Sequence, residues 1–118
     1  MSEHDKLLAL RDALRAFAAE RDWERFHTPK NLAMALAGEA GEVIEHFQWL
    51  SADESANLPE ERRAEVALEL ADVLLYLVRL ADVLDIDLGE AAQRKLALNA
   101  VRYPADKARG RSDKYDRL

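Results

Sequence analysis

The sequence predicts an all-α fold, a four-helix bundle followed by a short basic tail, and three observations support this class. Apolar residues recur at spacings of three and four in four separate segments, which is the period of an amphipathic helix. The chain has only four glycines and three prolines in 118 residues, of which 49% are hydrophobic, so helix breakers are few. No segment shows the period-two alternation of a half-buried strand. We expect one domain over residues 1–118, with an ordered core at about 5–103 and a tail at 104–118.

The first two helices are predicted in the N-terminal half. Leucines and a phenylalanine at helical spacing place the first over residues 5–22. The second is expected to begin at Thr28-Pro29, because threonine is a favoured N-cap and proline is tolerated at the first helical position. Its apolar pattern continues to about Trp49. The polar residues 51–58 are then expected to form a loop.

The third and fourth helices follow. Pro59 opens a segment whose apolar positions are so dense that we expect the central, most buried helix of the bundle. Its longest apolar stretch, residues 70–84, contains three charged side chains, so it is interpreted as a buried helix and not as a membrane span. Asp87 and Glu90 form a capping-box-like start for a fourth helix that continues to about Val101.

Charge and cysteine content exclude several classes of function. The net charge of −6 argues against DNA or RNA as the main partner. The absence of cysteine excludes disulfides, thiolate metal sites and thiol catalysis. No apolar signal region is found at the N-terminus, so we expect a cytoplasmic protein. Residues 102–118 carry six Lys or Arg against three Asp, which suits a segment that meets an anion, although a solvated tail is the alternative.

Two pairs of acidic residues lie where a helix should be apolar. Glu39 and Glu42 are three residues apart in the second helix, so both carboxylates project from one face, and Glu69 and Asp72 repeat this spacing in the third. Asp72 is surrounded by apolar residues, and a buried carboxylate needs a cation, a partner or a raised pKa. If the two helices are antiparallel neighbours, four oxygen donors surround one site, which suits Mg²⁺ or Mn²⁺. For either pair taken alone, a solvated face or a salt bridge to arginine remains the alternative.

The pattern Glu-x-x-Glu, 26 intervening residues and Glu-x-x-Asp resembles the metal-binding signature of the all-α NTP pyrophosphatases, the MazG-like superfamily. Flanking blocks extend the likeness over about residues 5–115 and resemble the dCTP pyrophosphatase branch. These blocks are Glu20-Arg-Asp-Trp-Glu-Arg-Phe-His27, Pro29-Lys-Asn-Leu32, Gly38-Glu-Ala-Gly-Glu42, Phe47-Gln-Trp49, Asp72-Val-Leu-Leu-Tyr76, Asn99-Ala-Val-Arg-Tyr-Pro104 and Arg109-Gly-Arg-Ser-Asp-Lys-Tyr115.

The resemblance implies a MazG-like helical fold and an Mg²⁺-dependent hydrolase that cleaves dCTP, or a related or modified pyrimidine dNTP, to the monophosphate and pyrophosphate. It implies that the metal is held by Glu39, Glu42, Glu69 and Asp72. A water is expected to attack the α-phosphorus, with Glu39 or Glu42 accepting its proton. The expected role is nucleotide-pool sanitation, and the expected assembly is a homo-oligomer, a dimer or a dimer of dimers.

The same resemblance implies substrate contacts on both sides of the metal site. Trp49 is expected to stack on the pyrimidine and His27 to hydrogen-bond the base or sugar, while ordinary core packing is the alternative for Trp49 and Tyr76. A base-facing position that is His in some relatives falls on Leu14, which leaves base preference open. The full expected substrate set is Trp23, His27, Lys30, Asn31, Trp49, Tyr76, Asn99, Arg102, Lys114 and Tyr115. From their residue types, the candidates to meet the triphosphate are Lys30, Arg102, Lys114 and Tyr115, and solvent exposure is the alternative for each.

Three other functions compete with this interpretation. A broad-specificity MazG-like pyrophosphohydrolase would share the metal site but discriminate little between bases. A phosphoribosyl-ATP pyrophosphohydrolase has a related helical site, but the blocks around Trp23 and Trp49 argue against it. A non-catalytic helical binding or dimerisation module would retain the acidic cluster without turnover.

Overall fold

The computed structural model describes residues 2–118, and in that range it contains six α-helices, two short 3-10 helices and no strand. The predicted all-α class is confirmed. The chain divides into two compact units, one ending at Ile86 and one beginning at Asp87, and each is described by itself. Throughout residues 2–118, no helix has both the length and the apolar character that crossing a membrane requires.

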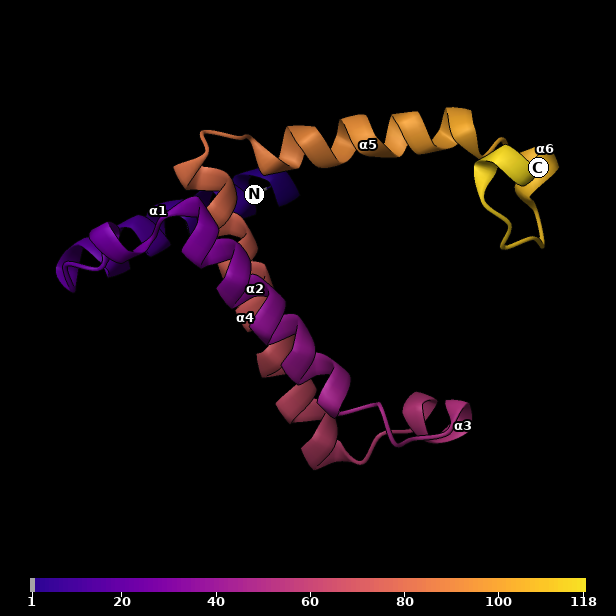
Figure 1. Ribbon diagram of the computed structural model, residues 1–118, viewed down its shortest axis with the longest axis horizontal. Coiled ribbons are helices and arrows are strands. Elements are labelled where there is room, and N and C mark those ends of the chain that lie inside the picture. The colour runs from indigo at the N-terminus through magenta and orange to yellow at the C-terminus, as the bar shows by residue number, and fades with distance from the viewer. Residues whose placement is uncertain (1) are drawn as a thin grey trace. The chain divides into compact units, whose positions relative to one another are not determined.

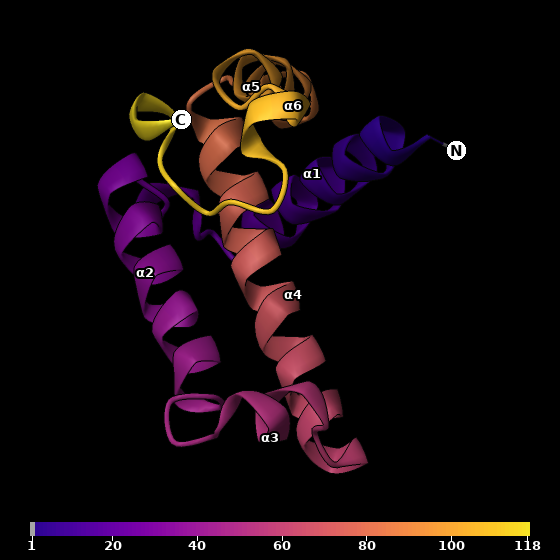
Figure 2. The same cartoon turned by 90° about the vertical axis from the view of Figure 1, so that its right-hand side faces the viewer.

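The first unit contains three long helices, and two of them lie side by side. In chain order its elements are α1 (Glu3–Glu20), a 3-10 helix (Glu24–Phe26), α2 (Pro29–Glu45), α3 (Ala52–Ala56) and α4 (Glu60–Val83). Helices α2 and α4 run antiparallel along most of the length of α2, as both views show (Figures 1 and 2). Helix α1 also packs against α4. This arrangement brings the two acidic segments predicted from the sequence onto neighbouring helices.

The helix starts follow the expected capping chemistry. Thr28 Oγ1 accepts a hydrogen bond from the backbone N–H of Asn31 at 3.2 Å, and Pro29 occupies the first helical position, as predicted. The predicted loop at residues 51–58 is wrong over α3, because Ser51 and Glu54 form a reciprocal capping box that starts a short helix. Helix α2 also ends at Glu45, earlier than predicted, since the chain continues in turns rather than in helical hydrogen bonds.

The core of the first unit is small and lies where α1, α2 and α4 meet. Its buried apolar side chains come from all three helices, namely Ala18, Leu32, Val66, Val78 and Ala81. As expected, α4 is the central helix of this unit, because it packs against both α1 and α2 and supplies Val66, Val78 and Ala81 to the core, but it is not buried all round. Leu68 is 72% exposed and Leu70 is 53% exposed, because α1 and α2 cover only part of the circumference of α4.

The second unit consists of α5 (Leu88–Arg102), α6 (Ala105–Ala108) and a 3-10 helix (Tyr115–Arg117). Asp87 caps α5 by accepting a hydrogen bond from the backbone N–H of Glu90 at 3.0 Å, so this predicted helix start is confirmed. The ring of Tyr115 lies edge-on to that of Tyr103, with 6.0 Å between centroids. The guanidinium of Arg102 lies 4.9 Å from the centroid of the Tyr115 ring. The basic tail is therefore folded against the C-terminal end of α5.

Candidate metal site and adjoining pocket

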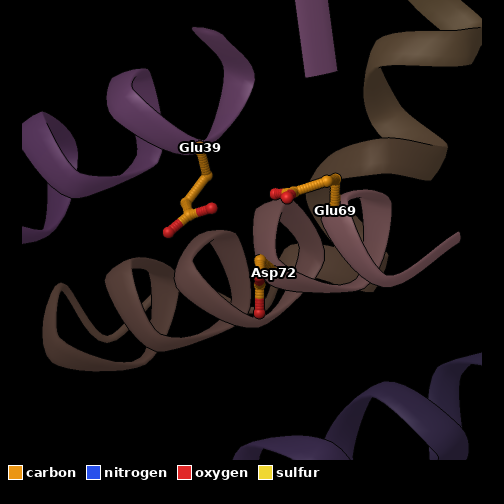
Figure 3. A group of neighbouring side chains, drawn as sticks. All are labelled: Glu39, Glu69 and Asp72. Atoms are coloured by element: carbon orange, nitrogen blue, oxygen red, sulfur yellow. The ribbon is translucent and has the colours of Figure 1, made fainter. Parts of the chain in front are cut away.

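A cluster of carboxylates lies between α2 and α4. One oxygen from each of Glu39, Glu69 and Asp72 lies within 4.8 Å of the others. Figure 3 shows Glu39 reaching from α2 towards α4, which carries Glu69 and Asp72. The i, i+3 spacing places Glu42 on the same face of α2, where its carboxyl neighbours those of Glu39 and Glu69. The structure therefore brings together the four acidic side chains that the sequence singled out.

The cluster is electrostatically unfavourable without a cation. Glu39 and Glu69 each keep one buried oxygen, Oε2, that has no hydrogen-bond partner among the described residues. Burial raises the pKa of Glu39, and the neighbouring carboxyl of Glu42 raises it further. The hydrogen bond with Glu42 raises the pKa of Glu69, with burial adding to the effect. Both shifts reflect the cost of bringing carboxylates together with little solvent around them. An oxygen-only donor set of this kind is what a hard divalent cation prefers.

Asp72 does not lie in the environment that the sequence suggests. The apolar residues around it predict a buried side chain, but in this chain that side chain is exposed. The prediction is wrong because α4 presents Asp72 on a part of its surface that α1 and α2 leave open. Asp72 also lines the neighbouring pocket, so it is shared between the carboxylate cluster and that pocket.

The pocket has a volume of about 460 Å³ and lies beside the cluster. Its wall is mostly apolar and is supplied by α1, α4, the segment that joins α1 to α2, and Leu32 of α2. Among its lining residues are Leu14, Trp23, His27, Asp72, Tyr76 and Arg79. Of the substrate residues expected from the sequence, Trp23, His27 and Tyr76 are thus gathered in one place. Leu14, the position expected to face the base, lines the same pocket.

The end of α1 positions Trp23 at this pocket. Asp22 has a left-handed φ of 55°, a conformation that Asp adopts more readily than most residues. The backbone N–H of Trp23 then bonds back to the carbonyl of Ala18 at 3.0 Å, which closes the helix as a Schellman motif does. The indole packs edge-on against Phe17 on one side, 5.7 Å between centroids, and against His27 on the other, at 6.4 Å. Phe17, Trp23 and His27 thus form an aromatic wall of the pocket, and the backbone turn at Asp22 fixes its position.

A hydrogen-bonded chain of charged groups supports this wall. Arg79 Nε donates to His27 Nδ1 at 3.0 Å, and Arg79 Nη1 donates to Asp82 Oδ2 at 3.3 Å. Arg15 on α1 donates to the same carboxylate, with Nε at 2.8 Å from Oδ2. The hydrogen bonds from Arg15 hold the pKa of Asp82 below its usual range, while burial and then the charge of Arg79 lower the pKa of His27. No local signal in the sequence marks Arg79 as a site residue, because its partner His27 is 52 positions away.

The remaining expected substrate residues lie outside the pocket lining. Trp49 follows α2 and is 87% exposed, and Lys30 is exposed on the first turn of α2. The amide of Asn31 donates to the carbonyl of Phe26 at 3.1 Å, so it supports the turn that carries the aromatic wall. The other four belong to the second unit: Asn99, Arg102, Lys114 and Tyr115.

Glu-x-x-Glu on one helix and Glu-x-x-Asp on its antiparallel neighbour, in an all-α fold, is the arrangement expected for the MazG-like superfamily, and a family model agrees with it. The model described as the MazG-like family matches residues 35–118, so the chain belongs to the MazG-like family. The predicted family and MazG-like fold are confirmed.

Individual proteins similar to this chain indicate a branch within the family. The chain is 50% identical over 104 residues to dCTP pyrophosphatase 1 of Homo sapiens and 49% identical over 104 residues to that of Mus musculus. Each match covers 86% of this chain and 61% of the relative, so the chain spans about three fifths of the length of these curated proteins. The crystal structure of a pyrophosphatase from Archaeoglobus fulgidus matches with a TM-score of 0.78 and 44% identity, covering 88% of this chain and 95% of that one. The predicted dCTP pyrophosphatase branch therefore agrees with the relatives found.

Proposed function

We propose that this chain is an Mg²⁺-dependent nucleoside triphosphate pyrophosphohydrolase that cleaves dCTP, or a related or modified pyrimidine dNTP, to the monophosphate and pyrophosphate. The observation that carries the proposal is the convergence of Glu39, Glu69 and Asp72 within 4.8 Å, beside an aromatic-walled pocket. This arrangement occurs in a chain about half identical to mammalian dCTP pyrophosphatases. The biological role that follows is sanitation of the nucleotide pool in the cytoplasm.

The carboxylate cluster fits a divalent cation. The unpartnered Oε2 atoms of Glu39 and Glu69 are buried, and a ligand that offers only hydrogen-bond acceptors could not satisfy them, whereas a cation can. Glu39, Glu42, Glu69 and Asp72 would hold Mg²⁺, and Mn²⁺ is expected to substitute because it accepts the same oxygen donors. A bound cation of this kind offsets the charge of a triphosphate and lowers the pKa of a water molecule.

The pocket is proposed to receive the base. Its apolar wall suits the faces of a pyrimidine ring, and Trp23 and Tyr76 offer flat surfaces against which that ring can pack. Because Asp72 is shared by the pocket and the cluster, a base in the pocket places the phosphates towards the carboxylates. Hydrolysis is proposed to occur by attack of water on the α-phosphorus, with pyrophosphate as the leaving group and Glu39 or Glu42 accepting the proton.

The other substrate contacts are proposed from the family resemblance and from the types of the residues. Trp49 and Asn31 are proposed to complete the base and sugar site. Lys30, with Arg102, Lys114 and Tyr115 of the second unit, is proposed to meet the triphosphate, and Asn99 to cap the ligand. The stacking of Arg102 on Tyr115 keeps one cation near the folded tail, which supports an anion-binding role for that tail.

The exposed apolar surface of α4 supports a homo-oligomer, proposed as a dimer or a dimer of dimers. Leu68 and Leu70 are more than half exposed, and Leu74 is 38% exposed, although all belong to a dense apolar segment. Large apolar side chains that a chain of this size leaves exposed are candidates for contact with another subunit. In such an assembly residues 1–118 are proposed to act as one catalytic domain.

The experiment that tests the proposal measures pyrophosphate release from a panel of NTPs and dNTPs, with Mg²⁺ and with EDTA. We expect metal-dependent release that is fastest with dCTP and yields dCMP. Comparable rates on many bases would retain the reaction class but indicate a broad-specificity MazG-like enzyme. No release from any nucleotide by a folded, metal-loaded sample would favour the non-catalytic module.

A further inference from the structure

The side chain of Arg79 has an unusual partner for a buried guanidinium. It is 10% exposed, comes from α4 and lines the pocket, yet its Nε–H points to a histidine ring rather than to a carboxylate. The acceptor is Nδ1 of His27, at 3.0 Å. His27 is itself a pocket residue, and its ring is packed edge-on against Trp23. The contact therefore acts directly on a group that faces the ligand.

This hydrogen bond determines which nitrogen of His27 carries the proton. A guanidinium has only donors and does not lose its proton in proteins, so Nδ1 must accept and must be unprotonated. A neutral imidazole with a bare Nδ1 carries its hydrogen on Nε2. The ring then offers one donor and no acceptor to anything placed in the pocket.

The position of Arg79 is itself fixed by a second set of contacts. Asp82 lies one turn further along α4, with a side chain 8% exposed, and accepts from Arg79 Nη1 at 3.3 Å. Arg15 on α1 holds the other side of that carboxylate through two hydrogen bonds. Because bidentate arginine–carboxylate pairs restrict orientation, the direction of the Arg79 side chain is determined from both α1 and α4.

We propose that Arg79 is a positioning residue that holds His27 as an Nε2–H donor, so that the pocket selects an acceptor atom on the nucleotide. The proposal rests on the proposed function for the identity of the ligand. The acceptor is a carbonyl oxygen or an unprotonated ring nitrogen, both of which a pyrimidine such as cytosine presents. An exocyclic amino group directed at His27 would meet a second donor and be disfavoured. The rest of the wall is largely apolar, so the His27 donor has a large share in setting the orientation of the ligand.

The test measures the protonation pattern of His27 directly in the full-length protein. In ¹⁵N-labelled wild type at neutral pH, long-range ¹H–¹⁵N correlation spectra distinguish the two neutral tautomers and the cation. The His27 signals are assigned by their loss in His27→Gln, and His4 and His46 serve as internal references. We expect only the Nε2–H tautomer for His27. A wild-type spectrum with Nδ1–H, or with the cation, overturns the proposal without any further variant.

Variants at position 79 then test the role of the arginine. Arg79→Ala should give a mixture of tautomers, while Arg79→Lys, which keeps a donor, should restore Nε2–H in part. Arg63→Ala is the matched control, because it removes the same charge from an exposed position of α4. A pattern in Arg79→Ala that equals the wild type overturns the role of Arg79, provided that its circular dichroism spectrum shows a folded protein.

Kinetics supply a second readout that separates this inference from the proposed function. For dCTP we expect Arg79→Ala to raise KM about tenfold, the loss of one oriented hydrogen bond, with kcat within about twofold. A fall in kcat at unchanged KM overturns the positioning role in substrate binding. If wild type shows the Nε2–H tautomer but cleaves no nucleotide, the proposed function fails while the hold of Arg79 on His27 stands.

Discussion

Replacing Asp82 with asparagine should destabilise the protein although Asp82 belongs neither to the carboxylate cluster nor to the pocket lining. The substitution keeps the size of the side chain but removes the charge that two arginines share. Arg79 is then left with a guanidinium 10% exposed whose remaining protein partner is the ring of His27. Arg15, which is 53% exposed, can turn to water instead.

The expected magnitude follows from these exposures. The bond from Arg79 is long, 3.3 Å, but it joins two nearly buried charges, and a hydrogen bond between charged groups contributes about 1.5–3 kcal/mol. The amide introduced by Asp82→Asn retains a carbonyl oxygen that can accept a hydrogen bond from Arg79. The loss in the free energy of unfolding should therefore stay below the ~3–5 kcal/mol expected when a buried charge is left without a partner. We expect a loss of about 2 kcal/mol in the free energy of unfolding. For a chain of this length that lowers Tm by about 8 °C.

The assay is thermal unfolding followed by circular dichroism at fixed protein concentration, with Asp12→Asn as the control. Asp12 is also an aspartate that faces Arg15, but its side chain is 62% exposed and the separation is 3.8 Å. An exposed pair of this kind contributes less than about 1 kcal/mol, so Asp12→Asn should melt within about 2 °C of wild type. Equal melting temperatures for the two variants would refute the assignment of Asp82 as a buried anchor.

The same variant predicts a change in acid sensitivity. The pKa of Asp82 is lowered in the folded state, chiefly by the hydrogen bonds from Arg15. Such a group contributes stability that is present above the unfolded pKa of about 3.9 and is lost as pH falls through the folded pKa. Wild type should therefore lose stability more steeply than Asp82→Asn below about pH 4. If the free energies of unfolding of the two proteins changed in parallel with pH in this range, the lowered pKa of Asp82 would be contradicted.

Three further predictions concern the site. Asp72→Asn keeps the volume of the side chain but removes a negative charge that is proposed to bind the metal. Pyrophosphate release should therefore fall by at least about a hundredfold, with an unchanged circular dichroism spectrum. Turnover at the wild-type rate would disprove the site assignment. With Mg²⁺ at about a hundredfold excess over its Kd, the Tm of wild type should be about 10 °C higher than the Tm measured in EDTA. An equal rise in Asp72→Asn would contradict the binding of the metal by this carboxylate. Trp23→Ala should lower the free energy of unfolding by about 1–2 kcal/mol, because the indole packs against both Phe17 and His27. Trp49→Ala removes a side chain that is 87% exposed, so chemical denaturation should give a free energy of unfolding within about 0.5 kcal/mol of wild type.

Local features of the sequence predict the helices and the acidic cluster well. Thr28-Pro29 and Asp87 mark helix starts because capping depends on residues within one turn. Glu39 with Glu42, and Glu69 with Asp72, can be placed on common faces from their spacing alone. That these faces meet follows once α2 and α4 are antiparallel neighbours, which the structure confirms.

Features that depend on tertiary packing were beyond the reach of the sequence. The exposure of Asp72 depends on how much of α4 its neighbours cover, and apolar density in the sequence does not reveal which surface another chain would bury. The contact between Arg79 and His27 depends on the Schellman turn after α1 and on the register of α4, which are set by different parts of the chain. Arg79 and Asp82 lie inside the apolar stretch of α4 and are nearly buried, but the partners that hold them come from α1 and from the segment before α2.

The adjacency of Leu14 and Arg15 on α1 has a consequence for how substrate range can evolve. Leu14 lines the pocket, while Arg15, the next residue, fastens α1 to Asp82 on α4. Selection can therefore vary the size or polarity of side chain 14 while the helix that carries it stays anchored one position away. A combinatorial library at Leu14, built without touching Arg15, is the simplest route to variants of this protein with altered nucleotide preference.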